Sequence, residues 1–100
     1  MSQGKTLINF TCVCGTLPFV EVVKKRYTTG DIALCIEMVI NGRRETLMIA
    51  SCLIPGIPED CVAIKDFAEN WGCLRELTNA GAIDDPHTYL RGYPICRVLF

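Results

Sequence analysis

The sequence predicts one α+β domain over residues 1–100, with an antiparallel sheet of about five to six strands and one short helix packed on it. Three observations predict this class. Hydrophobic residues recur at every second position through the first two-thirds of the chain, as they do in strands. The spacing becomes helical after residue 66, and turns rich in Gly, Pro, Asn and Asp separate the segments. A chain of 100 residues accommodates one hydrophobic core.

The clearest element is a hairpin formed by residues 32–40 and 45–53. Five hydrophobic residues share one face of its first segment: Ile32, Leu34, Ile36, Met38 and Ile40. The other face is mixed, which is typical of a sheet packed mainly on one side. Asn41 and Gly42 follow at once, and both tolerate the positive φ angles of a tight hairpin turn.

Shorter patterns predict the other strands. Residues 7–14 and 19–27 precede the hairpin, and residues 61–65 and 93–99 follow it. The stretch 54–60 has to leave the sheet, because its two prolines lack the N–H that a strand donates. A turn at 28–31 and a loop over 84–92 complete the expected connections.

The single helix is expected to begin near Asp66. Asp66 and Glu69 have a spacing like that of a capping box, in which the aspartate accepts a helix N–H. Gly72 weakens the first turn, so the helix is expected to be firm only from Trp71 or Gly72 onward. Gly81 suits the left-handed position that ends a helix.

The amino-acid composition indicates in which cellular compartment the protein works and which classes of partner its charge alone does not attract. The net charge of −1 supplies no overall field to attract nucleic acid or an anionic membrane. The seven cysteines are an odd number and most lie in apolar runs, where they act as small hydrophobic residues, as is typical of a reducing compartment. The chain has no stretch near the roughly 20 apolar residues of a membrane helix and does not begin with a signal peptide. We therefore expect a cytoplasmic protein.

The sequence contains no pattern that identifies a catalytic, cofactor-binding or metal-binding site. His87 is the only histidine and lies in a predicted loop. Cys12 and Cys14 share one strand face, but structural zinc sites usually need two close pairs, and the other five cysteines are scattered. We expect no catalytic residues, no cofactor and no metal. A small cysteine-dependent enzyme that pairs a thiol with His87 stays an alternative.

Several stretches resemble an uncharacterised family of small proteins encoded on plasmids, conjugative elements and phages, known as a domain of unknown function. These are RYTTGDIAL at 26–34, GRRE at 42–45, KDFAENWGCL at 65–74, NAGAI at 79–83 and GYPICRVL at 92–99. The resemblance implies an accessory protein of a mobile element or phage, with an α+β fold. It supplies no catalytic residues, because none are established for the family.

The leading hypothesis is therefore a non-catalytic protein that binds another protein, for which an inhibitor of a host defence system such as CRISPR is one concrete form. Its contact residues are expected to be Trp71, Asn70, Tyr89 and Arg91. Trp71 has two interpretations, since it can close the core where helix meets sheet or stand exposed as an anchor for a partner. A homo-oligomer is also compatible with a sheet that one helix leaves partly uncovered.

A second hypothesis is weak nucleic-acid binding. It relies on two basic clusters: Lys24, Lys25 and Arg26, and Arg43 and Arg44. If residues 19–27 and 32–40 pair as a hairpin, these clusters lie toward opposite ends of the sheet. That arrangement disfavours a single patch that follows phosphates, so nucleic acid ranks below a protein partner.

Overall fold

The computed structural model describes residues 4–12 and 15–100 and confirms the α+β class. The described strands are β1 (Gly4–Cys12), β2 (Gly15–Arg26), β3 (Ile32–Ile40), β4 (Arg43–Ile49), β5 (Ser51–Cys52), β6 (Cys61–Ile64), β7 (Thr88–Leu90) and β8 (Tyr93–Arg97). The helical elements are a 3₁₀ turn, η1 (Ala68–Asn70), and one α-helix, α1 (Cys73–Asn79). Helix α1 has seven residues, and no helix in the described part of the chain has the length and apolar character needed to traverse a bilayer.

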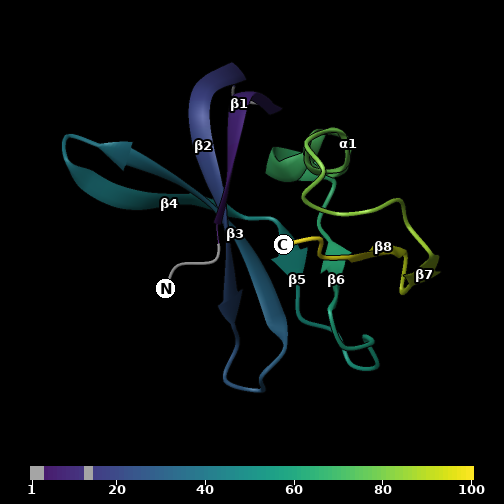
Figure 1. Cartoon of the computed structure of the whole chain (residues 1–100). Coiled ribbons are helices and arrows are strands. Elements are labelled where there is room, and N and C mark those ends of the chain that lie inside the picture. Colours follow the sequence, from purple (N-terminus) through teal and green to yellow (C-terminus); the bar gives the residue numbers. More distant parts are fainter. Residues whose placement is uncertain (1–3, 13–14) are drawn as a thin grey trace.

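The strands form two antiparallel sheets rather than one. The first has the order β1-β2-β3-β4 and the second the order β5-β6-β8-β7. In Figure 1 the β3–β4 hairpin projects to the left as an arm, while the second sheet and α1 occupy the right-hand side. Strand β7 lies within the predicted loop 84–92, which is the one strand that the sequence pattern missed entirely.

The hydrophobic core lies where the two sheets and α1 meet. Strands β1 to β3 contribute Leu7, Phe10, Val20, Val22, Ile32, Leu34 and Ile36, and the rest of the chain contributes Ala50, Val62, Ile64, Cys73, Leu77, Ala82, Ile83, Cys96 and Val98. Cys73 and Cys96 are buried members of this core, as their apolar surroundings in the sequence predicted. Ile32, Leu34 and Ile36 face the core, as the period-two pattern predicted. Ile40, at the far end of the same face, is 42% exposed on the projecting hairpin. Ala33, Cys35 and Glu37, on the face predicted to be mixed, are also buried.

The chain passes from the first sheet to the second at Ala50, which divides the strand predicted over 45–53. The N–H of Ala50 donates to the carbonyl of Leu34 at 2.7 Å, and its own carbonyl accepts the N–H of Lys65 at 2.8 Å. The next residue, Ser51, turns its hydroxyl back to β3 and accepts the N–H of Leu34 at 2.9 Å. The hydroxyl of Ser51 thus supplies the acceptor that a main-chain carbonyl of the neighbouring strand would otherwise supply to Leu34.

Two tight turns shape the hairpins. Asn41 and Gly42 both have positive φ, at 52° and 77°, as a two-residue type I′ turn requires, and β4 consequently begins at Arg43 rather than at residue 45. The β7–β8 hairpin has the same design, since Arg91 and Gly92 have φ of 53° and 83°. The sequence predicted the first turn and not the second.

The α-helix begins later than expected. Gly72 is its N-cap and has φ of 93°, so α1 starts at Cys73. Asp66 does accept a helix N–H, that of Leu74 at 2.9 Å, but it does so from outside the helix, across the 3₁₀ turn. The side chain of Glu69, the other half of the predicted capping box, lies outside the described residues.

The end of the helix follows the prediction. Gly81 has φ of 75°, and its N–H donates to the carbonyl of Thr78. The N–H of Ala82 donates to the carbonyl of Leu77. These two bonds form a Schellman motif, which satisfies carbonyls at the end of the last turn.

Replacing Ser51 by Ala is expected to lower the free energy of unfolding by about 1–3 kcal/mol, because it leaves the buried N–H of Leu34 without an acceptor. Urea denaturation measures the change. Thr28→Ala, at an exposed turn position, is the control and should change stability by less than about 0.5 kcal/mol. Equal stabilities for the two variants would contradict this role of Ser51.

Candidate functional site

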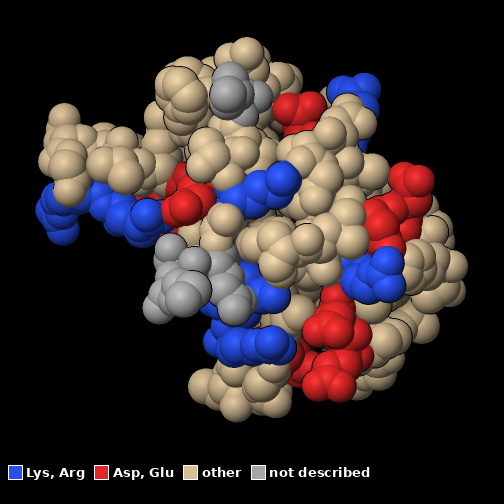
Figure 2. Space-filling view, viewed as in Figure 1, with Lys and Arg blue, Asp and Glu red and all other residues tan. Residues whose placement is uncertain are grey.

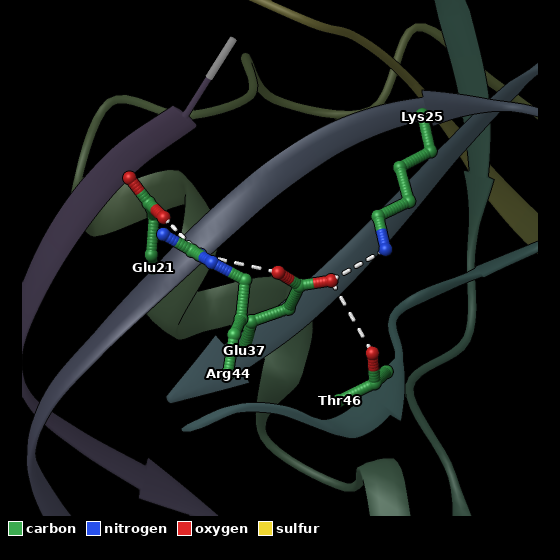
Figure 3. Close-up of polar contacts among 5 residues, drawn as sticks. All are labelled: Glu21, Lys25, Glu37, Arg44 and Thr46. Carbon is green, nitrogen blue, oxygen red and sulfur yellow. Dashed lines mark hydrogen bonds and ion pairs between the residues drawn. The ribbon is translucent and has the colours of Figure 1, made fainter. Parts of the chain in front are cut away.

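Two regions bring several polar or aromatic side chains together in a defined arrangement. The first is a charged cluster on the first sheet. The carboxylate of Glu37 is only 2% exposed and lies 2.6 Å from Lys25 Nζ and 3.1 Å from Arg44 Nη1. Thr46 donates its hydroxyl to the same carboxylate at 3.2 Å. Arg44 also forms an ion pair with Glu21, and Figure 3 shows all five side chains converging over β2, β3 and β4.

Strand register explains this convergence. Glu21 and Thr46 stand directly opposite Glu37 on the two neighbouring strands. Lys25 lies near the end of β2 and Arg44 close to the β3–β4 turn, so their backbones are at opposite ends of the sheet, as predicted. Their long side chains nevertheless reach back along the sheet to the same carboxylate, which the predicted separation of the two clusters did not anticipate.

The positive and negative charges of the cluster offset each other. The hydrogen bond from Lys25 lowers the pKa of Glu37; burial opposes this, and Arg44 and Thr46 reinforce it. The same bond raises the pKa of Lys25. Hydrogen bonds from Arg44 to Glu21 and Glu37 raise the pKa of the guanidinium. Two carboxylates therefore offset two cations, and neither cation is left uncompensated for a phosphate.

Most of the other predicted nucleic-acid contacts are also engaged within the chain. Lys24 Nζ donates to the main-chain oxygen of Phe100 at 2.7 Å and lies 5.9 Å from the centre of that ring. Arg26 donates to the carbonyl of Gly30 at 3.1 Å. Arg43 is exposed, and its side chain has no hydrogen bond or ion pair to any described residue. In Figure 2 the basic side chains of the projecting arm adjoin acidic ones, so they form no continuous basic track on this face.

The second region is a hollow of about 450 Å³ between the β7–β8 hairpin and the segment that leads into α1. Its walls are largely aromatic and apolar, and we call it the aromatic hollow. The lining residues are Ile64, Asp66, Phe67, Leu74, Tyr89, Arg91, Gly92, Tyr93 and Pro94. Its volume lies within the range of natural ligand pockets.

Two of the three aromatic rings in the described lining of the hollow, those of Phe67 and Tyr93, pack against each other, and the rings of Phe67 and Tyr89 are accessible. The ring centres of Phe67 and Tyr93 are 5.9 Å apart and the rings are tilted by 43°. Phe67 is 47% exposed and Tyr89 is 61% exposed. Tyr89 stands opposite Pro94 in the β7–β8 pairing, which turns both residues to the same face of the hairpin. The hollow therefore presents the ring pair of Phe67 and Tyr93 and, from the other face of the hairpin, the exposed ring of Tyr89.

The structure brings together only part of the predicted contact set. Tyr89 and Arg91 line the aromatic hollow. Trp71 is 63% exposed, so it does not close the core, and it lies outside the hollow at the end of the 3₁₀ turn. Asn70 is only 2% exposed, and its side-chain amide donates to the carbonyl of Ile49 at 2.9 Å. Asn70 thus anchors the segment that carries the exposed rings.

Phe67 and Tyr93 are the residues that sequence reasoning missed. The sequence predicts a helical segment from Asp66 that includes Phe67, and an ordinary strand that begins at Tyr93, so neither pattern indicates that the two rings meet. The available signal was Gly92 between two hydrophobic segments, because a glycine between short apolar runs is typical of a hairpin. Recognising that hairpin would have placed Tyr89 and Tyr93 on adjacent strands.

The histidine and two thiols lie near one carboxylate, but the raised pKa of each thiol disfavours nucleophilic chemistry. Asp84 accepts the main-chain N–H of Arg97 at 2.7 Å and lies 2.6 Å from His87 Nε2. Burial acts to raise the pKa of Asp84, and the contacts with Arg97 and His87 outweigh it, so the pKa is lowered. Burial raises the pKa of the Cys96 thiol to about 12, and Asp84 adds to the effect. The pKa of Cys61 is raised for the same two reasons.

The described residues contain no group of three or more His, Cys, Asp or Glu side chains placed to hold a metal ion. Of the predicted strand-face pair, Cys14 and the side chain of Cys12 lie outside the described residues. The described thiols of Cys35, Cys73 and Cys96 are buried, and those of Cys52 and Cys61 are partly buried. Most of the described sulfur atoms therefore pack as apolar groups.

Comparisons with known proteins identify no relative of this chain. No protein-family model, no curated protein and no solved structure matches the chain. The resemblance to a domain family of mobile elements therefore stays a prediction. What the site does has to be inferred from its own residues.

Replacing Glu37 by Gln is expected to lower the free energy of unfolding by about 1.5–3 kcal/mol at neutral pH, because charge-assisted hydrogen bonds are lost while Lys25 and Arg44, both half exposed, regain water. The folded pKa of Glu37 lies below the ordinary value of 4.5, so its contribution is complete above that pH and is lost as pH falls through the folded pKa. Glu37→Gln should remove this part of the acid sensitivity in urea titrations.

Glu45→Gln is the matched control for this prediction. Glu45 is exposed on β4, and its side chain has no hydrogen bond or ion pair to a described residue. Its replacement should leave both stability and the acid profile within about 0.5 kcal/mol of the parent protein. An acid profile that Glu37→Gln does not alter would show that the cluster contributes no pH-dependent stability.

Alkylation of the native chain tests the cysteine-enzyme alternative. Iodoacetamide at pH 8 should modify Cys96 and Cys61 more slowly in the folded than in the unfolded chain, because burial raises the pKa of both thiols. Peptide mass spectrometry of timed samples measures each site. A single cysteine that reacts faster than free cysteine would contradict the expectation and favour an enzyme.

Proposed function

We propose that this protein is a non-catalytic binding protein that holds a segment of a partner protein in the aromatic hollow. The observation that carries the proposal is the exposure of Phe67 and Tyr89 on the walls of a hollow that also contains Tyr93 and Arg91. Tyrosine and arginine are enriched among the residues that dominate binding energy at protein interfaces. Exposed apolar rings that gather around a recess are typical of surfaces that bind a partner or a ligand.

The surroundings of these rings favour binding without large rearrangement. Ile64 is fully buried at the base of the hollow, and Leu74 belongs to α1. Asp66, on the same wall, is fixed by its bond to the N–H of Leu74. A site whose walls are already ordered loses less conformational entropy when a partner binds.

The chemistry of the lining also favours binding over catalysis. Its ionisable side chains, among the described residues, are Asp66, Arg91, Tyr89 and Tyr93. Asp66 is engaged as a helix cap, and the lining contributes no histidine or cysteine. A general acid and base placed around a substrate position would be needed for hydrolysis or transfer.

The biological setting of the proposal comes from the sequence: cysteines in apolar runs favour a reducing compartment, and the resemblance favours a mobile element or phage. We place the protein in the cytoplasm, as an accessory protein of a mobile element or phage. Within that setting, inhibition of a host defence system such as CRISPR is the concrete role that we propose. A small binding domain with a preformed recognition surface is compatible with such a role.

Capture from a lysate of the bacterial host tests the proposal. The whole chain is used as bait in parallel with the double variant Phe67→Ala/Tyr89→Ala, and quantitative mass spectrometry compares the retained proteins. Loss of two rings from an interface centre should reduce retention of a true partner by roughly 30-fold or more. Phe19→Ala, an equally exposed ring on the first sheet, is the matched control and should retain the partner.

Two further arms complete this experiment. Trp71→Ala shows whether the exposed tryptophan belongs to the same contact. A host defence assay with and without the chain tests the anti-defence role separately. Failure to retain any protein, or equal retention by the parent chain and the double variant, would contradict binding through the aromatic hollow.

A further inference from the structure

Arg91 is the one cation among the described residues that line the aromatic hollow. It is exposed, and no described residue accepts a hydrogen bond from it or forms an ion pair with it. This distinguishes it from Lys25 and Arg44, whose charges are offset by carboxylates. The hollow thus presents a guanidinium that forms no ion pair with a described residue, although the carboxylate of Asp66 also lines the hollow.

The backbone does not explain the choice of arginine at this position. Arg91 has φ of 53° in a two-residue type I′ turn, a position that favours asparagine, aspartate and glycine. A residue with a longer side chain in the left-handed region costs about 1 kcal/mol. The equivalent place in the β3–β4 turn is held by Asn41, as the backbone prefers. The side chain of Arg91, rather than its turn conformation, is therefore the feature that needs a function.

We infer that the occupant of the aromatic hollow is a peptide segment that carries a large apolar or aromatic side chain next to a carboxylate. This inference rests on the proposed function and names the chemistry of its partner. The apolar side chain packs in the hollow against the paired rings of Phe67 and Tyr93, where aromatic pairs gain energy beyond their buried area. The carboxylate pairs with Arg91, whose planar guanidinium matches it with two parallel hydrogen bonds.

A single-stranded nucleic acid is the competing occupant, because bases also stack on aromatic rings. Binding of that kind requires a basic groove that follows several phosphates. The described lining of the hollow contains one cation, and Asp66 contributes one carboxylate. The local formal charge is therefore near zero, which suits one acidic side chain better than a polyanion.

Selection from a phage-displayed library of random dodecapeptides tests the inference with the whole chain as target. The parent protein should enrich sequences in which Phe, Tyr, Trp or Leu lies within two positions of Asp or Glu. Arg91→Asn should keep the apolar preference and lose the acidic one, and Arg91→Asp should select Lys or Arg instead. Both replacements suit the positive φ of the turn, so the hairpin is retained.

The affinity of the best selected peptide, measured by fluorescence polarisation, should fall about tenfold in Arg91→Asn, which is the loss expected for one charge-assisted contact. Arg43→Asn is the matched control, because Arg43 is exposed, lies outside the hollow and also has no ion pair to a described residue. It should leave both selection and affinity unchanged.

Three results would overturn the inference: no enrichment, apolar sequences without an acidic preference, or an unchanged selection by Arg91→Asp. Salt-sensitive binding of a labelled 20-nucleotide single strand that Arg91→Asp abolishes would identify nucleic acid as the occupant and would also overturn it. These outcomes leave the proposed function standing if lysate capture still depends on Phe67 and Tyr89. Capture that does not depend on those rings would instead remove the proposed function itself.

Discussion

The arrangement of the molecule depends on how the chain satisfies its backbone where it crosses between the two sheets at Ala50. Buried N–H and C=O groups have to find partners, and a strand that leaves its sheet deprives its neighbour of them. Ser51 replaces one lost partner by accepting the N–H of Leu34. Asn70 replaces another by donating its side-chain amide to the carbonyl of Ile49. Two polar side chains therefore complete the crossing, and both are buried for that reason.

The crossing also determines where the aromatic hollow forms. Asn70 ties the 3₁₀ turn to the end of β4, and Asp66 ties the segment before that turn to the first residues of α1. Phe67 lies between these two anchors, so its ring stays beside Tyr93 although it is half exposed. The rigidity that we attribute to the hollow is thus a consequence of hydrogen bonds that the crossing requires.

The sequence predicted those features of the fold that depend on neighbouring residues alone, such as tight turns and alternating hydrophobic positions. The β3–β4 hairpin was predicted because Asn41-Gly42 combines a strong turn signal with alternating neighbours. The crossing at Ala50 was missed because the largely apolar run over residues 47–53 continues past it and contains no Gly or Pro to mark a break. The start of α1 was placed too early because Asp66 caps the helix from outside it. The cluster around Glu37 was unpredictable, since strand periodicity gives the direction of a side chain but not the reach of its neighbours.

The contrast between the two charged regions explains why we place recognition at the hollow and not on the first sheet. Both regions contain arginine beside exposed apolar groups, since Phe19 and Val39 flank the cluster around Glu37. In the cluster, a partner's anion would have to displace Glu21 or Glu37 from Arg44, and the displaced carboxylate would be left uncompensated. At Arg91 an anion displaces only water. Arg91, which forms no ion pair with a described residue, can therefore select a partner by its carboxylate. Arg44 cannot do so, although more charged side chains surround it, because Glu21 and Glu37 already occupy its guanidinium.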